Sequence, residues 1–330
     1  MTGQSNVASP VGADPDAVSV QRPPTAGDRP PLHGAATPWL WMSVAAALIA
    51  VAGNVVGLAD IGGVYGKETP AFVNQAIAQD TINLAVVCPA IIILVLLARR
   101  GRLGAYLAWL GTLAFTVYNY VIYTFSVHAG ALFLPWIAVL GLAVYSLIGG
   151  LAALDVGAVK ARFHRASRRM AGWFLIVVAA VFTALWLSGI IPALLAGDVP
   201  AGARELGLPS NPVHVLDLAF YLPAAFAGGV LLLRGRPWAY AIAPGLLVFL
   251  ALTGLPILLT PFVANARGDA PGWAVLPPVA VITVVSVALT VRLLSAVRPP
   301  NASAISCPHR STAPYVDADR SSSTSREERS

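Results

Sequence analysis

Apolar residues recur along the chain in eight long runs that are separated by polar connections. Each run holds about twenty mostly apolar positions, which is the length that an α-helix needs to cross a bilayer. Inside hydrocarbon every backbone N–H and C=O must be paired within its own segment, so we expect these runs to be helices. Their approximate ranges are 39–58, 81–98, 103–125, 132–154, 170–196, 214–233, 238–260 and 274–296. The pattern predicts an all-α, polytopic transmembrane helical bundle of about eight helices.

The two ends of the chain lack this pattern. Residues 1–37 are rich in Pro, Gly, Ala and Asp, and residues 299–330 are rich in Ser and end in mixed charges. Such segments bury too little apolar surface to offset the entropy lost on ordering, so we expect two disordered tails. The first apolar run begins only near Trp39 and no cleavage site follows it, which argues against a secretory signal.

Composition agrees with a membrane protein, because 57% of the 330 residues are hydrophobic and only 11% are charged. A soluble domain carries about 25% charged residues. The formal net charge of +6 could indicate nucleic-acid binding, but the basic residues stand in short runs between apolar segments. A nucleic-acid-binding domain gathers them on one polar face. The lipid bilayer is therefore the expected partner, and nucleic acid is not.

Basic residues alternate between the connections and so predict the orientation. The connections after the second, fourth and sixth runs hold ten Lys and Arg, whereas the alternate connections hold three. By the positive-inside rule the richer side is cytoplasmic, which puts both termini inside. Because Arg far outnumbers Lys, we expect a multi-pass protein of the bacterial plasma membrane. The ten are Arg99, Arg100, Arg102, Lys160, Arg162, Arg165, Arg168, Arg169, Arg234 and Arg236, and the three are Lys67, Arg204 and Arg267.

An internal repeat is visible at an offset of 134 residues. Residues 39–115 and 173–249 are identical at 20 of 77 ungapped positions, and Arg-Gly-Arg follows eleven residues after both Pro89 and Pro223. The pattern predicts two four-helix repeats, and since four is even, both would insert the same way up around an axis along the membrane normal. A simpler interpretation is that Arg-Gly-Arg is a common cytoplasmic turn. The predicted parts are a tail at 1–37, repeats at 38–160 and 161–298, and a tail at 299–330.

Polar residues gather at the outer ends of equivalent helices. His214, Asp217 and Tyr221 follow i, i+3, i+7 spacing and share one helical face, and Asp80 and Asn83 occupy the equivalent positions of the first repeat. The third run adds a polar stripe, and two connections add residues at the same level. Because polar groups in hydrocarbon are costly and usually face the bundle interior, we expect an outward-facing pocket. Its candidate residues are Glu68, Asp80, Asn83, Asn119, Tyr123, His128, His214, Asp217 and Tyr221.

Three functions compete for this pocket. Its polar groups could serve only to hydrogen-bond neighbouring helices, as in a purely structural membrane protein. It could bind a small ligand or ion in a transporter or a sensor, with transport favoured because the tails are too short for an output domain. It could instead hold haem or a divalent metal through His128, His214 and Asp217, as in a membrane-embedded enzyme or redox protein. No His-x-x-x-His, His-Glu-x-x-His or Cys pair occurs, so no cofactor is predicted and no catalytic residue is assigned.

Three segments carry a resemblance to known proteins. They are 65–69 with 79–80 (Tyr-Gly-Lys-Glu-Thr and Gln-Asp), 118–123 (Tyr-Asn-Tyr followed by Tyr123), and 211–218 (Asn-Pro-Val-His-Val-Leu-Asp-Leu). Over residues 39–296 the chain resembles a family of uncharacterised bacterial eight-helix integral membrane proteins. That family has no assigned activity, so the resemblance implies the membrane class and nothing about mechanism.

Overall fold

A computed structural model of the chain describes residues 30–32, 36–163 and 168–297. Within these ranges the prediction of an all-α fold with eight helices long and apolar enough to span a membrane is confirmed. The predicted tails fall almost entirely outside the described residues, except that Leu32 forms an isolated β-bridge with Leu154. The candidate spans are Ala36–Ala59, Pro70–Arg99, Leu103–Ser126, Phe133–Ala152, Arg168–Leu195, Pro212–Leu233, Pro237–Arg267 and Trp273–Ser295.

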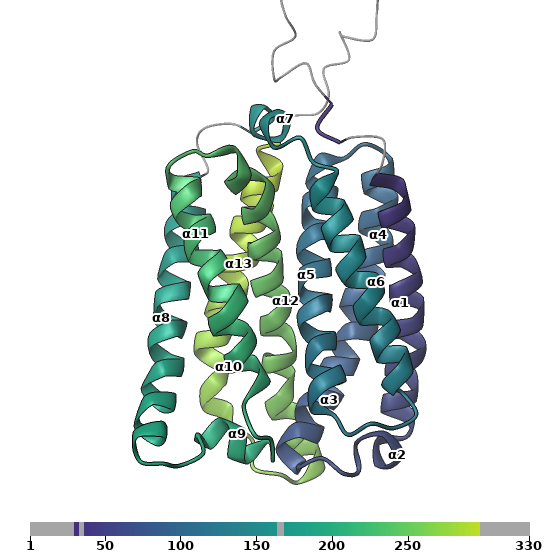
Figure 1. Cartoon of the computed structure of the whole chain (residues 1–330), viewed down its shortest axis with the longest axis vertical. Coiled ribbons are helices and arrows are strands. Elements are labelled where there is room, and N and C mark those ends of the chain that lie inside the picture. The colour runs from purple at the N-terminus through teal and green to yellow at the C-terminus, as the bar shows by residue number, and fades with distance from the viewer. Residues whose placement is uncertain (1–29, 33–35, 164–167, 298–330) are drawn as a thin grey trace, which may run out of the picture. The chain divides into compact units, whose positions relative to one another are not determined.

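The spans stand side by side in one bundle (Figure 1). We call residues 36–163 the first half and residues 168–297 the second half. The first half contains α1 (Ala36–Ala59), α2 (Ile61–Tyr65), α3 (Pro70–Ile82), α4 (Cys88–Arg99), α5 (Leu103–Ser126), α6 (Phe133–Ala152) and α7 (Val156–Ala161). The second half contains α8 (Arg168–Leu195), α9 (Ala201–Glu205), α10 (Pro212–Leu216), α11 (Leu222–Leu233), α12 (Pro237–Arg267) and α13 (Leu276–Ser295).

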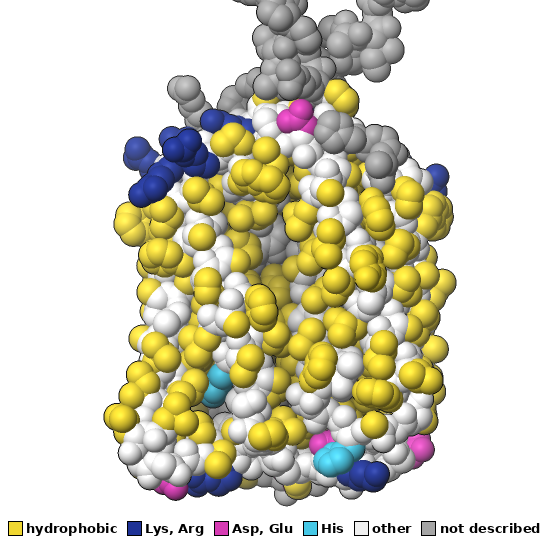
Figure 2. All heavy atoms as spheres, in the orientation of Figure 1, with side chains coloured by type: hydrophobic (Ala, Val, Ile, Leu, Met, Phe, Trp, Pro, Cys, Tyr) yellow, Lys and Arg dark blue, Asp and Glu magenta, His cyan; other side chains and the backbone are white. Residues whose placement is uncertain are grey.

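The two ends of the bundle differ in charge. Basic side chains gather at the end where α7 lies (Figure 2), which we call the basic end. The end with α2 and α9 is the opposite end. Between them many large apolar side chains are exposed, such as Leu195 at 84%, Phe125 at 78% and Leu134 at 73%. Such a continuous apolar surface needs lipid around it, because soluble monomers rarely expose apolar patches of this extent.

The second span begins earlier than the sequence pattern predicts. Residues 70–80, expected in a connection, are helical, because the Thr69 side chain caps the helix by accepting a hydrogen bond from the Phe72 backbone N–H and Pro70 occupies the first turn. Asp80 therefore lies ten residues, or about 15 Å, inside the helix rather than at its outer end. The seventh span likewise continues beyond 260 to Arg267, and Gly268 ends it with a left-handed φ of 80°.

Two of the spans contain a single π-helical turn. These turns, η1 (Asn83–Val87) and η3 (Asp217–Tyr221), begin 134 residues apart. Each precedes a proline, Pro89 or Pro223, whose ring would clash with the carbonyl four residues earlier in a regular α-helix. That carbonyl lies within the π turn in both cases, so the wider turn accommodates the ring. Such bulges are frequent at functional sites.

Helices α5 and α12 cross at the centre of the bundle. The crossing is close because Gly111 of α5 faces Gly245 of α12, and a β-carbon on Gly111 would overlap the backbone of Gly245. One turn further along, the rings of Phe115 and Phe249 are 6.1 Å apart between centroids. These contacts hold the two halves together and position the cavity described next.

Candidate functional site

A cavity of about 620 Å³ lies between the two halves, on the opposite-end side of the crossing of α5 and α12. Its size is within the range of small-molecule sites, about 300–1,000 Å³. Helices α3, α5, α9, α10 and α12 provide most of its wall, and α8 adds Trp186. The aromatic and polar residues that line it include Phe72, Asn74, Gln79, Phe115, Tyr118, Asn119, Tyr123, Trp186, Glu205, His214, Thr253 and Thr260.

Two amide side chains in the wall each have an atom without a hydrogen-bond partner. Asn74 and Asn119 are both only 4% exposed, and neither Oδ1 of Asn74 nor Nδ2 of Asn119 has a partner among the described residues. Leaving a buried polar atom unpaired costs about 1–3 kcal/mol. The Nδ2 of Asn74 donates to Asp269 at 2.8 Å, which fixes Oδ1 as the free acceptor. Two residues of the cavity wall thus carry one unpartnered acceptor and one unpartnered donor, both of them buried atoms.

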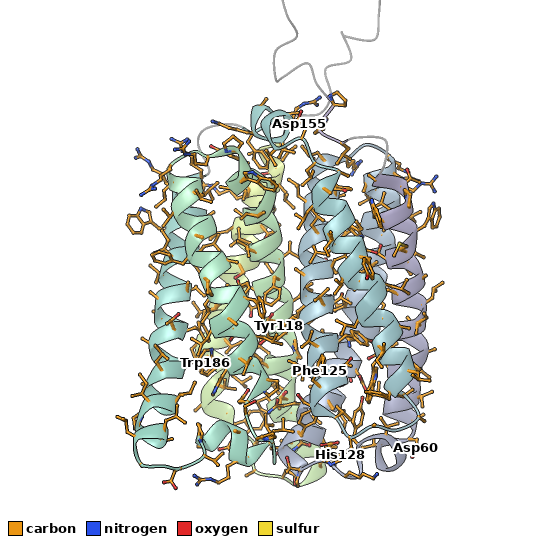
Figure 3. The ribbon with its side chains drawn as sticks, viewed as in Figure 1. Asp60, Tyr118, Phe125, His128, Asp155 and Trp186 are labelled. Atoms are coloured by element: carbon orange, nitrogen blue, oxygen red, sulfur yellow. The ribbon has the colours of Figure 1, made fainter. Side chains whose placement is uncertain are left out.

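On the second-half side, a group of side chains surrounds Asp217, and we call it the Asp217 cluster. Its carboxylate accepts hydrogen bonds from Tyr118 at 3.1 Å and from the Trp186 indole at 2.9 Å. The ring of His214 packs against Trp186, with centroids 4.4 Å apart. Tyr118, Trp186 and His214 all line the cavity, so this cluster faces it directly. Figure 3 shows Tyr118 and Trp186 at similar depth in the bundle.

On the first-half side, the Asp80 cluster consists of Asp80, Tyr65 and Tyr123. The two carboxylate oxygens accept from Tyr65 at 2.8 Å and from Tyr123 at 2.6 Å, and Asp80 is 1% exposed. Gly57 makes room for this carboxylate, because a β-carbon there would overlap it. Burial raises the pKa of Tyr65, and the nearby Asp80 carboxylate raises it further, so Tyr65 keeps its proton and remains a donor. Of the three residues only Tyr123 lines the cavity.

Asn83 and Tyr221 have partners within the bundle. Asn83 donates to Asn54 at 3.1 Å and accepts from Gln79 at 2.9 Å. Tyr221 donates to the Leu246 carbonyl at 3.1 Å, and its ring stacks on Phe249 at 4.2 Å. Both residues therefore join helices and lie behind the cavity wall.

Glu68 and His128 form a separate contact at the opposite end. Oε1 of Glu68 accepts from the His128 backbone N–H and lies 2.8 Å from its Nδ1. The His128 side chain is 60% exposed, and neither residue lines the cavity. In Figure 3 His128 lies at the edge of the bundle, well away from Trp186. The pair connects the α2–α3 and α5–α6 connections.

The candidate metal ligands His128, His214 and Asp217 do not come together. His128 pairs with Glu68, whereas His214 and Asp217 face Trp186 from the start of the sixth span. In the part of the chain that the structure describes, no three His, Cys, Asp or Glu residues form a group that could hold a metal ion.

The structure thus divides the candidate residues into three sets. Asn119, Tyr123 and His214 line the cavity. Asp80, Asn83 and Asp217 lie one residue behind it, each hydrogen-bonded to a lining side chain. Glu68, His128 and Tyr221 do not reach it.

Several residues of the site were not predicted. Asn54 carries an intramembrane amide, which is itself a signal for a buried polar contact. Asn74 and Trp186 gave no such signal, since the first lay in an expected connection and the second is apolar by pattern. Trp186 becomes part of the site only because α8 packs beside the sixth span.

The chain matches no protein-family model and no curated protein, and no solved structure matches it. Its class therefore follows from the fold and the surface alone. Eight apolar helices with apolar side chains exposed along their length identify an integral membrane protein.

Proposed function

We propose that the cavity is the binding site of a small ligand that enters from outside the cell. The observation that carries this proposal is the pair of unpartnered amide atoms, Oδ1 of Asn74 and Nδ2 of Asn119, in the cavity wall. Each such atom reduces stability, and of the three found among the described residues two belong to the cavity wall, the third being Oγ of Ser146 in α6. A ligand that supplies a donor and an acceptor recovers both losses when the two amide side chains turn toward it on binding.

The orientation belongs to this proposal. We place the basic end and both termini in the cytoplasm of a bacterium, because basic connections face inward in plasma-membrane proteins. The cavity then faces outward, since it lies on the side of α2 and α9. We also propose that the chain belongs to the bacterial eight-helix family that its sequence resembles. The segments that carry this resemblance include Tyr118, Asn119 and His214.

The proposal includes a tandem repeat of two four-helix units. Support comes from the pairs Gly111–Gly245 and Phe115–Phe249, in which each residue contacts its own equivalent at an offset of 134. Equivalent residues meet in this way only along a two-fold axis. The cavity lies near that axis, because Asn119 and its equivalent, Thr253, both line it.

Between transport and sensing, the repeat favours transport. In many transporters the binding site lies at the interface of two repeats, next to interrupted helices in corresponding positions. The π turns η1 and η3 are such interruptions, and Asp217 in η3 touches the cavity wall through Tyr118 and Trp186. A shift between the repeats around the Gly111–Gly245 contact would close the cavity on one side.

A thermal-stability screen with a cavity-filling variant tests the proposal. Purified protein is heated with a panel of amines, amino acids, sugars and organic acids. A ligand at about 100 times its Kd adds about 2.7 kcal/mol of stability, which raises the melting temperature of a chain of this length by about 4 °C. The substitution Asn119→Phe fills the cavity and should remove this shift, whereas Ser188→Phe on the exposed face of α8 should keep it. A shift that survives Asn119→Phe, or no shift with any compound, contradicts the proposal.

A further inference from the structure

We infer that the cavity selects an organic cation, namely an ammonium group on an apolar or aromatic body. The inference rests on the proposed function, since it requires that the cavity binds a small ligand. Its basis is the charge around the cavity, the aromatic wall and the free acceptor of Asn74.

Carboxyl groups lie around the cavity, whereas no Lys or Arg lines it. Glu205 lines it, and three further carboxylates are hydrogen-bonded to lining side chains: Asp217 to Tyr118 and Trp186, Asp80 to Tyr123, and Asp269 to Asn74. None of the residues lining the cavity, all of them in the described ranges, is Lys or Arg. The cation recorded beside these carboxylates is Arg267, 3.9 Å from Asp269.

Glu205 and Asp269, the two of these carboxyl groups that lie outside the spans, attract cations and repel anions. A cleft lined by one sign of charge between low-dielectric walls concentrates the opposite ion. The effect is larger here than at a surface, because the apolar wall reduces screening. An anionic ligand would have to enter without a Lys or Arg partner in the wall, where His214 is the basic side chain.

The uncharged part of the wall fits the same ligand. Phe72, Phe115, Tyr118, Tyr123 and Trp186 surround the cavity with aromatic rings, whose faces attract ammonium groups. The unpartnered Oδ1 of Asn74 can accept an ammonium N–H when the Asn74 side chain, whose Nδ2 donates to Asp269, shifts toward the ligand. The free Nδ2 of Asn119 can donate to a hydroxyl or carbonyl elsewhere on the ligand.

Three probes with one phenyl ring and different charges test the inference. The dissociation constants of 2-phenylethylammonium, 2-phenylethanol and phenylacetate are measured calorimetrically on the full chain in detergent. We expect the ammonium ion to bind about tenfold more tightly than the alcohol, and phenylacetate to bind more weakly than both.

Charge reversal at the cavity supplies the matched variants. Glu205 is exposed, so the substitution Glu205→Lys leaves the bundle intact while it changes the sign of a lining residue. It should weaken ammonium binding about tenfold and strengthen phenylacetate binding. The control is Asp198→Lys, at an exposed position that does not line the cavity, and it should leave all three constants unchanged.

The outcomes separate the two proposals. Equal binding of ammonium ion and alcohol, with both lost in Asn119→Phe, would overturn the charge selectivity and leave the binding cavity standing. Tighter binding of phenylacetate, or an ammonium ion that does not bind, would also overturn the inference. Ammonium binding that persists unchanged in both Asn119→Phe and Glu205→Lys would place the site elsewhere and remove both proposals.

Discussion

The Asp80 cluster and the Asp217 cluster occupy equivalent spans and yet differ in what they face. Asp80 is 1% exposed and both its donors, Tyr65 and Tyr123, lie within the first half. Asp217 is 8% exposed, and it binds one residue from each half, Tyr118 and Trp186, which both line the cavity. The Asp80 cluster therefore holds helices of the first half together, whereas the Asp217 cluster joins residues of both halves at the cavity wall. Stability should depend mainly on the first, and binding mainly on the second.

The largest effect is expected where the halves touch. Gly111→Ala puts a β-carbon against the backbone of Gly245, which cannot move aside as a side chain can. Overpacking usually costs about 1–3 kcal/mol, but here the β-carbon would overlap three backbone atoms of Gly245, so we expect a loss of about 5 kcal/mol or more. We expect the melting temperature to fall and the unfolding transition, which involves both clusters, to become less cooperative. Gly141→Ala is the control, because a β-carbon there meets nothing within 4 Å, and equal melting temperatures for the two variants would contradict the close crossing.

The next effect concerns Asp80. In Asp80→Ala the Tyr65 hydroxyl loses its acceptor and the Tyr123 hydroxyl keeps only the distant Ala76 carbonyl at 3.5 Å, and each group left unpaired or weakly paired costs about 1–3 kcal/mol. We expect a loss of about 2–5 kcal/mol, measured as a lower midpoint in denaturant. Asp198→Ala, at an exposed position, should change little. A variant as stable as the parent protein would show that the cluster does not close the first half.

Asp217→Ala should cost less stability and change binding more. Its partners, Tyr118 and Trp186, line the cavity, so water can replace the lost acceptor. We expect a loss of about 1–2 kcal/mol, together with a changed Trp186 emission and weaker ligand binding. If Asp217→Ala destabilises the protein more than Asp80→Ala, the contrast between the two clusters is wrong.

The smallest effect is expected at Glu68 and His128. The His128 side chain is 60% exposed, and the Glu68 carboxylate, which is 2% exposed, keeps the hydrogen bond from the His128 backbone N–H when that side chain is removed, so the side-chain contact should contribute about 0–1 kcal/mol. His128→Ala should leave the melting temperature nearly unchanged and ligand binding intact. A loss of ligand binding in this variant would contradict the prediction and would show that the binding site includes the connections at the opposite end.

The sequence predicts the number of spanning helices because each helix needs about 20 consecutive apolar residues to cross the bilayer. The start of the second span did not, because Asn74, Gln75, Gln79 and Asp80 reduce the apolar character of its first three turns. Thr69 followed by Pro70 is a helix-start signal that could have located it. Helix-capping signals of this kind can therefore locate the start of a span that a hydropathy pattern does not detect.

The candidate site was predictable only in part, for a physical reason. Polar residues inside apolar runs, such as Asn119 and His214, identify themselves because hydrocarbon makes them costly. Whether such a group is satisfied depends on partners from distant segments, as Asp80 depends on Tyr65 and Asp217 on Trp186. A cavity is volume that side chains leave empty, so its position follows from packing between helices and from no single stretch of sequence.

The most direct test of the outward-facing cavity is thiol labelling in intact cells. Asn119→Cys and Thr253→Cys are made separately in a chain whose Cys88 and Cys307 are replaced by serine, and a membrane-impermeant cationic thiol reagent is added outside. Both line the cavity, so both should react, whereas Ser43→Cys, at a position fully buried beside Trp109, should not. Labelling of neither cavity position, or labelling only after the membrane is broken open, would contradict the account.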